Sequence, residues 1–134
     1  MKKIVITGAL GYIGTELCKL YSGFSWKYEV VAIDNRFISE RVNELKRRKI
    51  KFIQADILDI DSIKKYLEEA EVIHHLAGIT DVAYVKKDSD KEKDHLIAKV
   101  AVEGTANILK SMNANATIVF PSTHVVSEGL KEQK

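Results

Sequence analysis

Cysteine and long apolar runs are scarce in this chain. Cys18 is the only cysteine among 134 residues, so a disulfide framework within the chain is excluded and a reducing cytoplasm suits the sequence. A buried, unreactive thiol is the favoured interpretation of Cys18, which lies in an apolar helical stretch. The short stretch Ile4–Ile6 passes straight into Thr7-Gly8 and lacks the apolar core of a signal peptide. Because no run approaches the ~18–20 apolar residues of a membrane span, we expect a soluble cytoplasmic protein without a membrane partner.

A surplus of charge of one sign is missing as well. The chain has 21 basic and 19 acidic side chains, which leaves a formal net charge of +2. The basic residues are interleaved with acidic ones rather than clustered. Neither nucleic acid nor an anionic membrane is therefore predicted as a partner. The single proline, Pro121, falls after the last apolar run.

The length and the composition, 46% hydrophobic and 30% charged, predict one domain with a substantial core. Five apolar runs rich in β-branched residues are each continuous, which is typical of parallel strands buried on both faces. These runs are Ile4–Ile6, Val30–Ile33, Ile50–Ile53, Val72–Leu76 and Thr117–Phe120. Helical periodicity lies between them, over Tyr12–Tyr21, Phe37–Arg48, Ser62–Ala70 and roughly Lys91–Met112.

The alternation of strands and helices predicts an α/β fold. Right-handed crossovers between parallel strands favour a Rossmann-type doubly wound sheet of about five strands. We expect the strand order 3-2-1-4-5, in a single domain that spans residues 1–134. The longest helix is expected to bury one apolar stripe, formed by Ile97, Val100, Ala101, Gly104, Ile108 and Met112.

A glycine-rich segment follows the first predicted strand at once and opens the first helix. It reads Thr7-Gly8-Ala9-Leu10-Gly11-Tyr12-Ile13-Gly14. A pyrophosphate needs backbone N–H groups close by, and glycine permits the turn and lacks the Cβ that would block the approach. The N-terminal end of the helix adds partial positive charge. The segment predicts a dinucleotide-binding loop, and the alternative is a tight turn that binds no ligand.

The spacing Gly-x-x-Gly-x-x-Gly, preceded by Thr, resembles that of the extended short-chain dehydrogenase/reductase family. This family includes the NAD-dependent epimerases and dehydratases of nucleotide sugars. The resemblance implies NAD as the cofactor and a nucleotide sugar as the second ligand of the full-length enzyme. It assigns the loop contacts with the cofactor to Gly8, Gly11, Tyr12, Ile13 and Gly14.

Asp34 ends the second predicted strand, twenty positions after Gly14. A carboxylate there can accept hydrogen bonds from both hydroxyls of the adenosine ribose and repels a 2′-phosphate, so NAD is favoured over NADP. Arg36 leaves the other possibility open, because a nearby arginine can accommodate that phosphate. The pair Asp34-Asn35 also resembles the Asp-Asn of UDP-glucose 4-epimerase-like members. The alternative for Asp34 is an ordinary turn residue.

The ends of the third and fourth strands extend the resemblance. Asp56-Ile57 matches the family's acidic residue that contacts the adenine amino group, together with the neighbour that lines the adenine pocket. A turn or a helix cap is the alternative for Asp56. His75-Leu76-Ala77-Gly78 is similar to the family's His-x-Ala-Gly. We add four residues from this region to the predicted cofactor site: Leu76, Ala77, Gly78 and Thr80.

Two adjacent histidines, His74 and His75, end the fourth predicted strand. Because neighbouring side chains of a strand point to opposite faces, they are not expected to form a metal site. For His75 a hydrogen-bonded structural role is favoured over catalysis.

The remaining matches lie near the end of the chain. Val102–Asn107 resembles the family's Asn-Val-x-Gly-Thr-x-Asn, although Ala101 replaces the first Asn, and the mid-helix Gly104 predicts close packing against the sheet. Pro121–Val126 resembles the family's active-site turn, in which Thr123 takes the catalytic Ser/Thr position. A polar turn after a strand is the alternative for this segment.

The family's acid/base, a Tyr in the sequence Tyr-x-x-x-Lys, is missing from these 134 residues. We expect an N-terminal portion of an epimerase or dehydratase that retains NAD binding but lacks turnover. The alternative is a stand-alone module that senses NAD or binds a partner. A homodimer is also predicted, because the strand Thr117–Phe120 has no charged residue to protect a sheet edge, and Leu96 and Leu109 lie off the long helix's apolar stripe.

Overall fold

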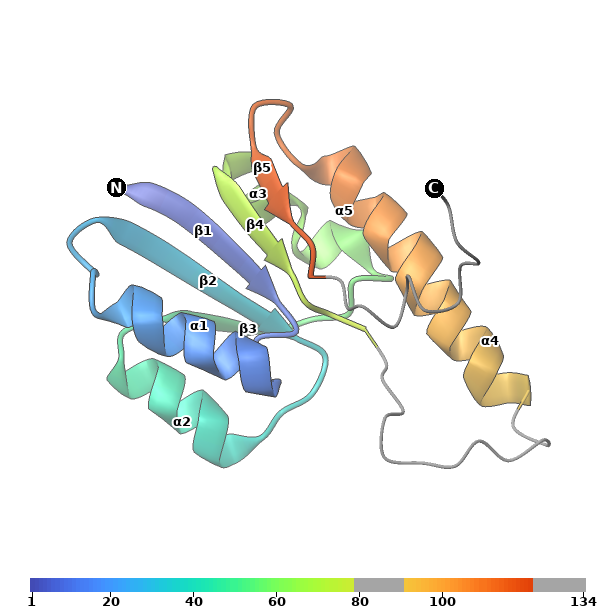
Figure 1. Cartoon of the computed structure of the whole chain (residues 1–134), viewed down its shortest axis with the longest axis horizontal. Coiled ribbons are helices and arrows are strands. Elements are labelled where there is room, and N and C mark those ends of the chain that lie inside the picture. The colour runs from blue at the N-terminus through green and yellow to red at the C-terminus, as the bar shows by residue number, and fades with distance from the viewer. Residues whose placement is uncertain (79–90, 122–134) are drawn as a thin grey trace, which may run out of the picture.

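The computed structural model describes residues 1–78 and 91–121, which form a five-stranded sheet with helices on both faces (Figure 1). The strands are β1 (Lys2–Thr7), β2 (Tyr28–Asp34), β3 (Lys51–Gln54), β4 (Val72–His75) and β5 (Thr117–Val119). The helices are α1 (Tyr12–Ser22), α2 (Ser39–Arg47), the 3₁₀ turn η1 (Ile60–Ser62), α3 (Lys64–Glu69), α4 (Lys91–Lys99), the π-helical segment η2 (Val100–Gly104) and α5 (Thr105–Ser111).

All neighbouring strands run parallel in the order β3-β2-β1-β4-β5, so the predicted fold class and strand order are confirmed. The order reverses at β1, and open α/β sheets bind ligands at such a switch point, beyond the carboxyl ends of the strands. Thr7, the last residue of β1, is level with Ile33 of β2 on one side and His75 of β4 on the other. The glycine-rich segment therefore leaves the sheet at its switch point.

Each face of the sheet has its own apolar core. The core beneath α1 and α2 contains Ile4, Ile6, Ala9, Leu10, Cys18, Val30, Ala32, Val42, Leu45 and Ile50. The core beneath α3 and α5 contains Val5, Ile33, Ile57, Ile63, Leu67, Ala70, Ile73 and Ile108. Successive residues of β1 enter opposite cores, as expected for a central parallel strand. Cys18 is buried as predicted, and burial raises the pKa of its thiol to about 12.

The two outer strands depart from the predicted burial on both faces. β3 and β5 stand at the ends of the strand order, and their residues are exposed or half-buried. Helices cover an edge strand less completely than a central one, because it has a neighbour on one side alone. The apolar run Thr117–Phe120 therefore ends at the surface, where Val119 and Phe120 are exposed.

The predicted helix over roughly Lys91–Met112 is confirmed as an unbroken helical stretch from Lys91 to Ser111, but its middle, η2, is π-helical rather than α-helical. A π-turn adds a residue to the helical turn and so rotates the preceding residues relative to the following ones. Ala101 is consequently exposed and does not join the predicted apolar stripe. Gly104 packs against Ile57, in the loop after β3, rather than against the sheet: a Cβ on Gly104 would lie 2.8 Å from Ile57 Cγ1.

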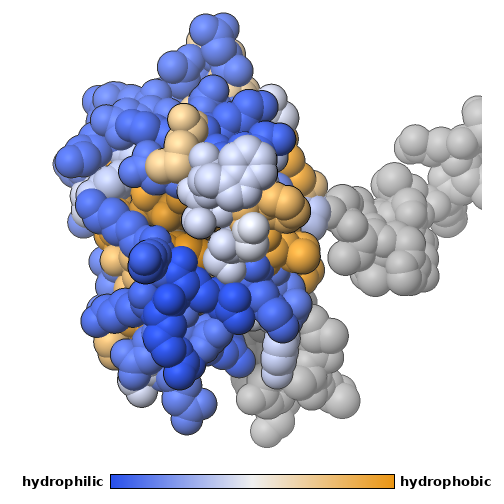
Figure 2. Space-filling model, turned by 90° about the vertical axis from the view of Figure 1, so that its left-hand side faces the viewer, coloured by the Kyte–Doolittle hydropathy of each residue, from blue (hydrophilic) through white to orange (hydrophobic). Residues whose placement is uncertain are grey.

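The amino ends of β1 and β2 lie at the end of the domain opposite the switch point (Figure 1). Figure 2 looks onto that end, where hydrophilic side chains cover much of the surface and apolar ones gather in the upper half. Within residues 1–78 and 91–121, no helix combines the length and the apolar character needed to cross a bilayer.

Candidate functional site

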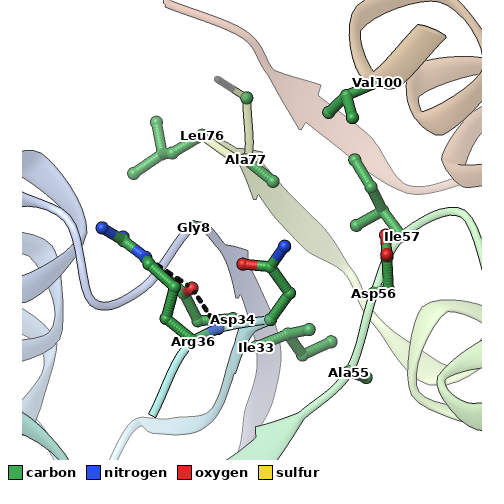
Figure 3. A pocket seen from close by; sticks show the side chains of 12 residues that line it. Gly8, Ile33, Asp34, Arg36, Ala55, Asp56, Ile57, Leu76, Ala77 and Val100 are labelled. Atoms are coloured by element: carbon green, nitrogen blue, oxygen red, sulfur yellow. Dashed lines mark hydrogen bonds and ion pairs between the residues drawn. The ribbon is translucent and has the colours of Figure 1, made fainter. Parts of the chain in front are cut away.

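Two adjoining hollows lie at the carboxyl edge of the sheet, and both include Gly8, Leu76, Ala77 and Gly78 in their walls. The first hollow adds Asp34, Asn35, Asp56 and Ile57 (Figure 3). The second adds Gly11, Tyr12, Ile13 and Gly14. The fold thus brings together every predicted cofactor-binding residue except Thr80. Thr80 and the predicted catalytic residue Thr123 lie outside the described residues.

The three glycines of the loop are required for different physical reasons. Gly8 has a φ of +66°, and a Cβ there would lie 2.7 Å from the backbone nitrogen of Ala77. A Cβ on Gly14 would lie 2.7 Å from the Cα of Ala9, so both positions require glycine for the fold itself. Gly11 has an ordinary extended backbone, and its Cβ would meet the Gly8 carbonyl at 3.3 Å. The packing of the protein therefore demands glycine least at Gly11, the position that faces the groove.

Helix α1 presents its N-terminal end to the second hollow. Its N-cap residue is Gly11, and no side chain among the described residues caps the first turn. The first-turn N–H groups and the positive end of the helix dipole are therefore available to an anionic group. Tyr12 and Ile13 are exposed at the same turn. The guanidinium of Arg41 lies over the Tyr12 ring, 5.5 Å from its centroid, and donates to the carbonyl of Leu10.

Asp34 is almost fully buried at the end of β2, with 4% of its surface exposed. Its Oδ2 accepts the backbone N–H of Leu10, 2.9 Å away, which ties the glycine-rich loop to β2. Arg36 donates to both carboxylate oxygens (Figure 3). Burial alone raises the pKa of the Asp34 carboxyl, but the hydrogen bonds from Arg36 and Leu10 and the Arg36 charge outweigh it and hold the pKa below its ordinary value. The side chain is therefore a carboxylate at neutral pH.

The loop after β3 forms the other wall of the first hollow. Asp56 is exposed, and its Oδ1 accepts the backbone N–H of Leu58 at 2.9 Å, which is the turn role that the sequence left open. Ile57 is buried, and its carbonyl accepts the side-chain amide of Asn107 at 3.0 Å. Val100, from the π-helical segment, faces the same hollow. Helix α5 and η2 therefore hold the apolar wall in place.

The two histidines of β4 lie on opposite faces, as the alternation of a strand predicts. His74 Nε2 lies 2.6 Å from the hydroxyl of Tyr21 on the α1 side. His75 is buried between Thr7 and Thr105, which occupy its two ring nitrogens. Burial lowers the pKa of both rings. This geometry favours the structural role predicted for His75.

Sequence reasoning did not identify two residues that line the groove, Arg41 and Val100. Arg41 and Val100 belong to helical segments whose patterns carry no signal for a ligand. Arg36 was weighed for its effect on cofactor choice, but its pairing with Asp34 was not predicted. Such a pair two residues apart depends on the turn after β2, which the residue types alone do not specify.

A phosphate-binding type of loop joins β1 to α1, a carboxylate ends β2, and the residues after the carboxyl end of β4 line the groove. These features define the Rossmann class of dinucleotide-binding domains. The chain belongs to the 3-beta hydroxysteroid dehydrogenase/isomerase family, whose model matches residues 5–133. The motifs and the fold place it within the extended short-chain dehydrogenases/reductases, in agreement with the resemblance noted from the sequence.

Similar proteins include enzymes and uncharacterised chains. An uncharacterised protein of Frog virus 3, 052L, is 32% identical over 110 residues, which cover 81% of this chain and 29% of the viral protein. UDP-glucose 4-epimerase from Bacillus subtilis is 35% identical over 88 residues, which cover 59% of this chain and 25% of the enzyme.

Among solved structures, a mutant of UDP-glucuronic acid 4-epimerase from Bacillus cereus, in complex with UDP-4-deoxy-4-fluoro-glucuronic acid and NAD, has a TM-score of 0.75. It is 28% identical, over 90% of this chain and 40% of the enzyme. The chain therefore spans between 25% and 40% of the length of these relatives.

Proposed function

We propose that this chain binds NAD along the groove at the carboxyl edge of its sheet, as the cofactor-binding part of an oxidoreductase similar to the nucleotide-sugar epimerases. The observation that carries the proposal is the convergence of a glycine-rich turn, a buried carboxylate and an apolar pocket at one switch point. These three features supply a pyrophosphate, a ribose diol and an adenine ring with the groups that each requires.

Each predicted residue has a specific part in this proposal. The N–H groups at the start of α1 hold the pyrophosphate, and Gly11 leaves room for its approach. The Asp34 carboxylate accepts the hydroxyls of the adenosine ribose, with Asn35 beside it. Asp56 Oδ2 accepts the adenine amino group while Ile57 packs on the ring. Leu76, Ala77 and Gly78 line the path of the nicotinamide half, and Thr80 remains a predicted contact from the sequence.

The chemistry of the cofactor, when bound, is to take a hydride from a secondary alcohol carbon and to return it. By the resemblance, Thr123 is the residue of this chain that would hold the reacting hydroxyl, and a nucleotide sugar is the substrate class. Without Tyr-x-x-x-Lys, the 134 residues alone are expected to bind the cofactor and not to turn over a nucleotide sugar. A reducing cytoplasm is the proposed setting.

A second candidate is a stand-alone module that binds NAD as a sensor or partner-binding domain. Ala101, which replaces the first Asn of the family's Asn-Val-x-Gly-Thr-x-Asn, favours this candidate. The two candidates differ in whether the encoding DNA continues in frame past Lys134 with a Tyr-x-x-x-Lys segment. That sequence supports the enzyme, and a stop codon supports the module.

Titration calorimetry with NAD and NADP tests the proposal directly. We expect NAD to bind more tightly, because the Asp34 carboxylate repels a 2′-phosphate. Asp34→Asn keeps the shape of the side chain but removes its charge. The variant should therefore prefer NAD over NADP by a smaller factor than the unmodified chain does. If neither NAD nor NADP binds, the proposed function is refuted. Equal or tighter binding of NADP would refute the preference and make Arg36 the deciding residue.

A further inference from the structure

The Asp34 carboxylate has no free acceptor position in the described structure, because four N–H donors occupy it. Its Oδ1 accepts the backbone N–H of Arg36 and the Nε–H of the same residue, each at 3.0 Å. Its Oδ2 accepts the backbone N–H of Leu10 at 2.9 Å and Nη2–H of Arg36 at 3.1 Å. A carboxylate offers about four lone-pair sites in all. Any further donor must therefore displace one that is already there.

Two of these four donors belong to the backbone and two to a side chain. The N–H groups of Leu10 and Arg36 are fixed by the glycine-rich loop and by the turn after β2. The guanidinium is different, because the Arg36 side chain reaches back across the groove and 53% of its surface is exposed. Its Nη2 lies 3.9 Å from the position that a Cβ on Gly11 would occupy, so it spans the gap between β2 and the loop. The guanidinium can therefore leave without any movement of the backbone.

The guanidinium also has the donor pattern of a ribose. Nε and Nη2 give one N–H to each carboxylate oxygen, in the paired geometry that arginine forms with carboxylates. The 2′ and 3′ hydroxyls of a ribose can likewise give one O–H to each oxygen. When the guanidinium leaves, the number of freed acceptor positions matches the number of hydroxyls in the diol.

We infer that the Arg36 side chain is an internal competitor for the diol position of Asp34, which an adenosine ribose must displace in order to bind. The inference rests on the proposed function and deepens it, because it names the residue that sets the strength of diol recognition. Arg36 keeps the buried carboxylate paired while no ligand is bound, which avoids the cost of a buried charge without a charged partner. In return, the diol contributes less to the affinity than it would at an open carboxylate.

The experiment compares two ligands that differ in the diol alone. Adenosine diphosphate and 2′,3′-dideoxyadenosine diphosphate share the adenine and the pyrophosphate, so the effect of the Arg36 charge on phosphate binding cancels in the ratio of their dissociation constants. Titration calorimetry measures this ratio for the full chain and for Arg36→Ala. The substitution removes Nε and Nη2 but keeps the backbone N–H that bonds to Oδ1.

The expected result is a larger preference for the diol in the variant. The ratio of dissociation constants, dideoxy to diol ligand, should rise about threefold to tenfold, which is the range for a half-exposed ion pair of good geometry. Arg36→Lys keeps the positive charge but cannot span both oxygens, so it should raise the ratio by a smaller factor. It also serves as the deciding variant if Arg36→Ala fails to fold. Arg47→Ala removes a distant exposed arginine of α2 and should leave the ratio unchanged.

Two outcomes would overturn the inference, and they are distinguishable. If NAD binds to the unmodified chain but neither Arg36 variant raises the ratio, Arg36 does not compete with the diol and the proposed function stands. If the unmodified chain and the variants all fail to bind both NAD and adenosine diphosphate, the proposed function fails and the inference fails with it.

Discussion

The hydroxyl of Thr7 lies 2.8 Å from Nδ1 of His75, and this contact determines which ring nitrogen carries the proton. Thr7 Oγ1 also accepts the backbone N–H groups of Leu76 and Ala77, each at 3.1 Å. With both lone pairs in use, the hydroxyl must donate its proton to Nδ1. The ring proton therefore sits on Nε2, which donates to the hydroxyl of Thr105 at 3.0 Å. The network joins β1, β4 and α5 behind the groove.

We predict that Thr7→Val destabilises the fold. The substitution preserves shape but leaves the N–H of Ala77 and Nδ1 of His75 without their partner, at an expected cost of about 2 kcal/mol, whereas the N–H of Leu76 keeps the Thr7 carbonyl at 3.2 Å. Urea unfolding measures the change. Thr7→Ser should recover most of the loss. Thr15→Val is the control, because the Thr15 hydroxyl bonds within its own helix, to Gly11 and Tyr12, and should cost about 0.5 kcal/mol or less. Equal losses in Thr7→Val and Thr15→Val would contradict the proposed network.

Stability should fall as the pH drops below the ordinary pKa of histidine, about 6.5. Burial lowers the pKa of His75 and of His74 in the folded chain, so the unfolded chain binds more protons in this range. Stability from these rings is therefore present above about pH 6.5 and is lost below it, by up to about 1.4 kcal/mol per pH unit for each ring.

Urea unfolding between pH 7.5 and pH 5 measures that slope. His75→Gln keeps one acceptor and one donor in the network and should remove the part of the pH slope that His75 contributes. His74→Gln, which should remove the part that His74 contributes, serves as the comparison. A slope that His75→Gln leaves unchanged would show that the buried ring does not titrate as its surroundings imply.

Gly11→Val should abolish NAD binding and leave a folded domain. Its backbone is extended, and the added side chain would enter the groove where the pyrophosphate is expected. Gly8→Ala should instead unfold the chain, because Gly8 has a positive φ and its Cβ would collide with the backbone of Leu76 and Ala77, just after β4. Circular dichroism reports folding and calorimetry reports binding. Gly23→Ala, at the end of α1, is the control for glycine replacement away from the groove. Normal NAD affinity in folded Gly11→Val would place the phosphate elsewhere.

The chain is predicted to form a homodimer through the outer face of the α4–α5 region. Leu109 is 52% exposed and Val102 is 69% exposed, seven positions earlier along the same helical stretch. Exposed apolar side chains on a helix favour self-association, and β5 offers a short edge that Pro121 limits. Sedimentation equilibrium should detect a dimer that Leu109→Glu dissociates, whereas Lys110→Gln, one position on, leaves it intact. A monomer at high concentration would refute the dimer, and an unaffected dimer would exclude this face.

Much of the fold follows from local sequence. Continuous apolar runs separated by helical periodicity lead to a parallel sheet, because a strand buried on both faces has no polar side to show. The handedness of the crossovers and the position of the glycine-rich turn then lead to the observed strand order. The sequence predicts Asp34 as a site residue because it ends a strand, and Asp56 and Leu76–Gly78 because they match the family's motifs. All of them lie at or just after strand ends, which meet at one edge of a parallel sheet.

What the sequence by itself determined is therefore which residues of the glycine-rich loop and of the strand ends reach the groove. Only the tertiary structure decided how they are paired there. Arg36 folds back onto Asp34, and the ring of His75 lies between Thr7 and Thr105, through contacts that join residues far apart in the chain or depend on one turn. The π-turn over Val100–Gly104, where Gly104 packs on Ile57, is likewise a feature that local helix propensity does not specify, because that contact joins residues far apart in the chain.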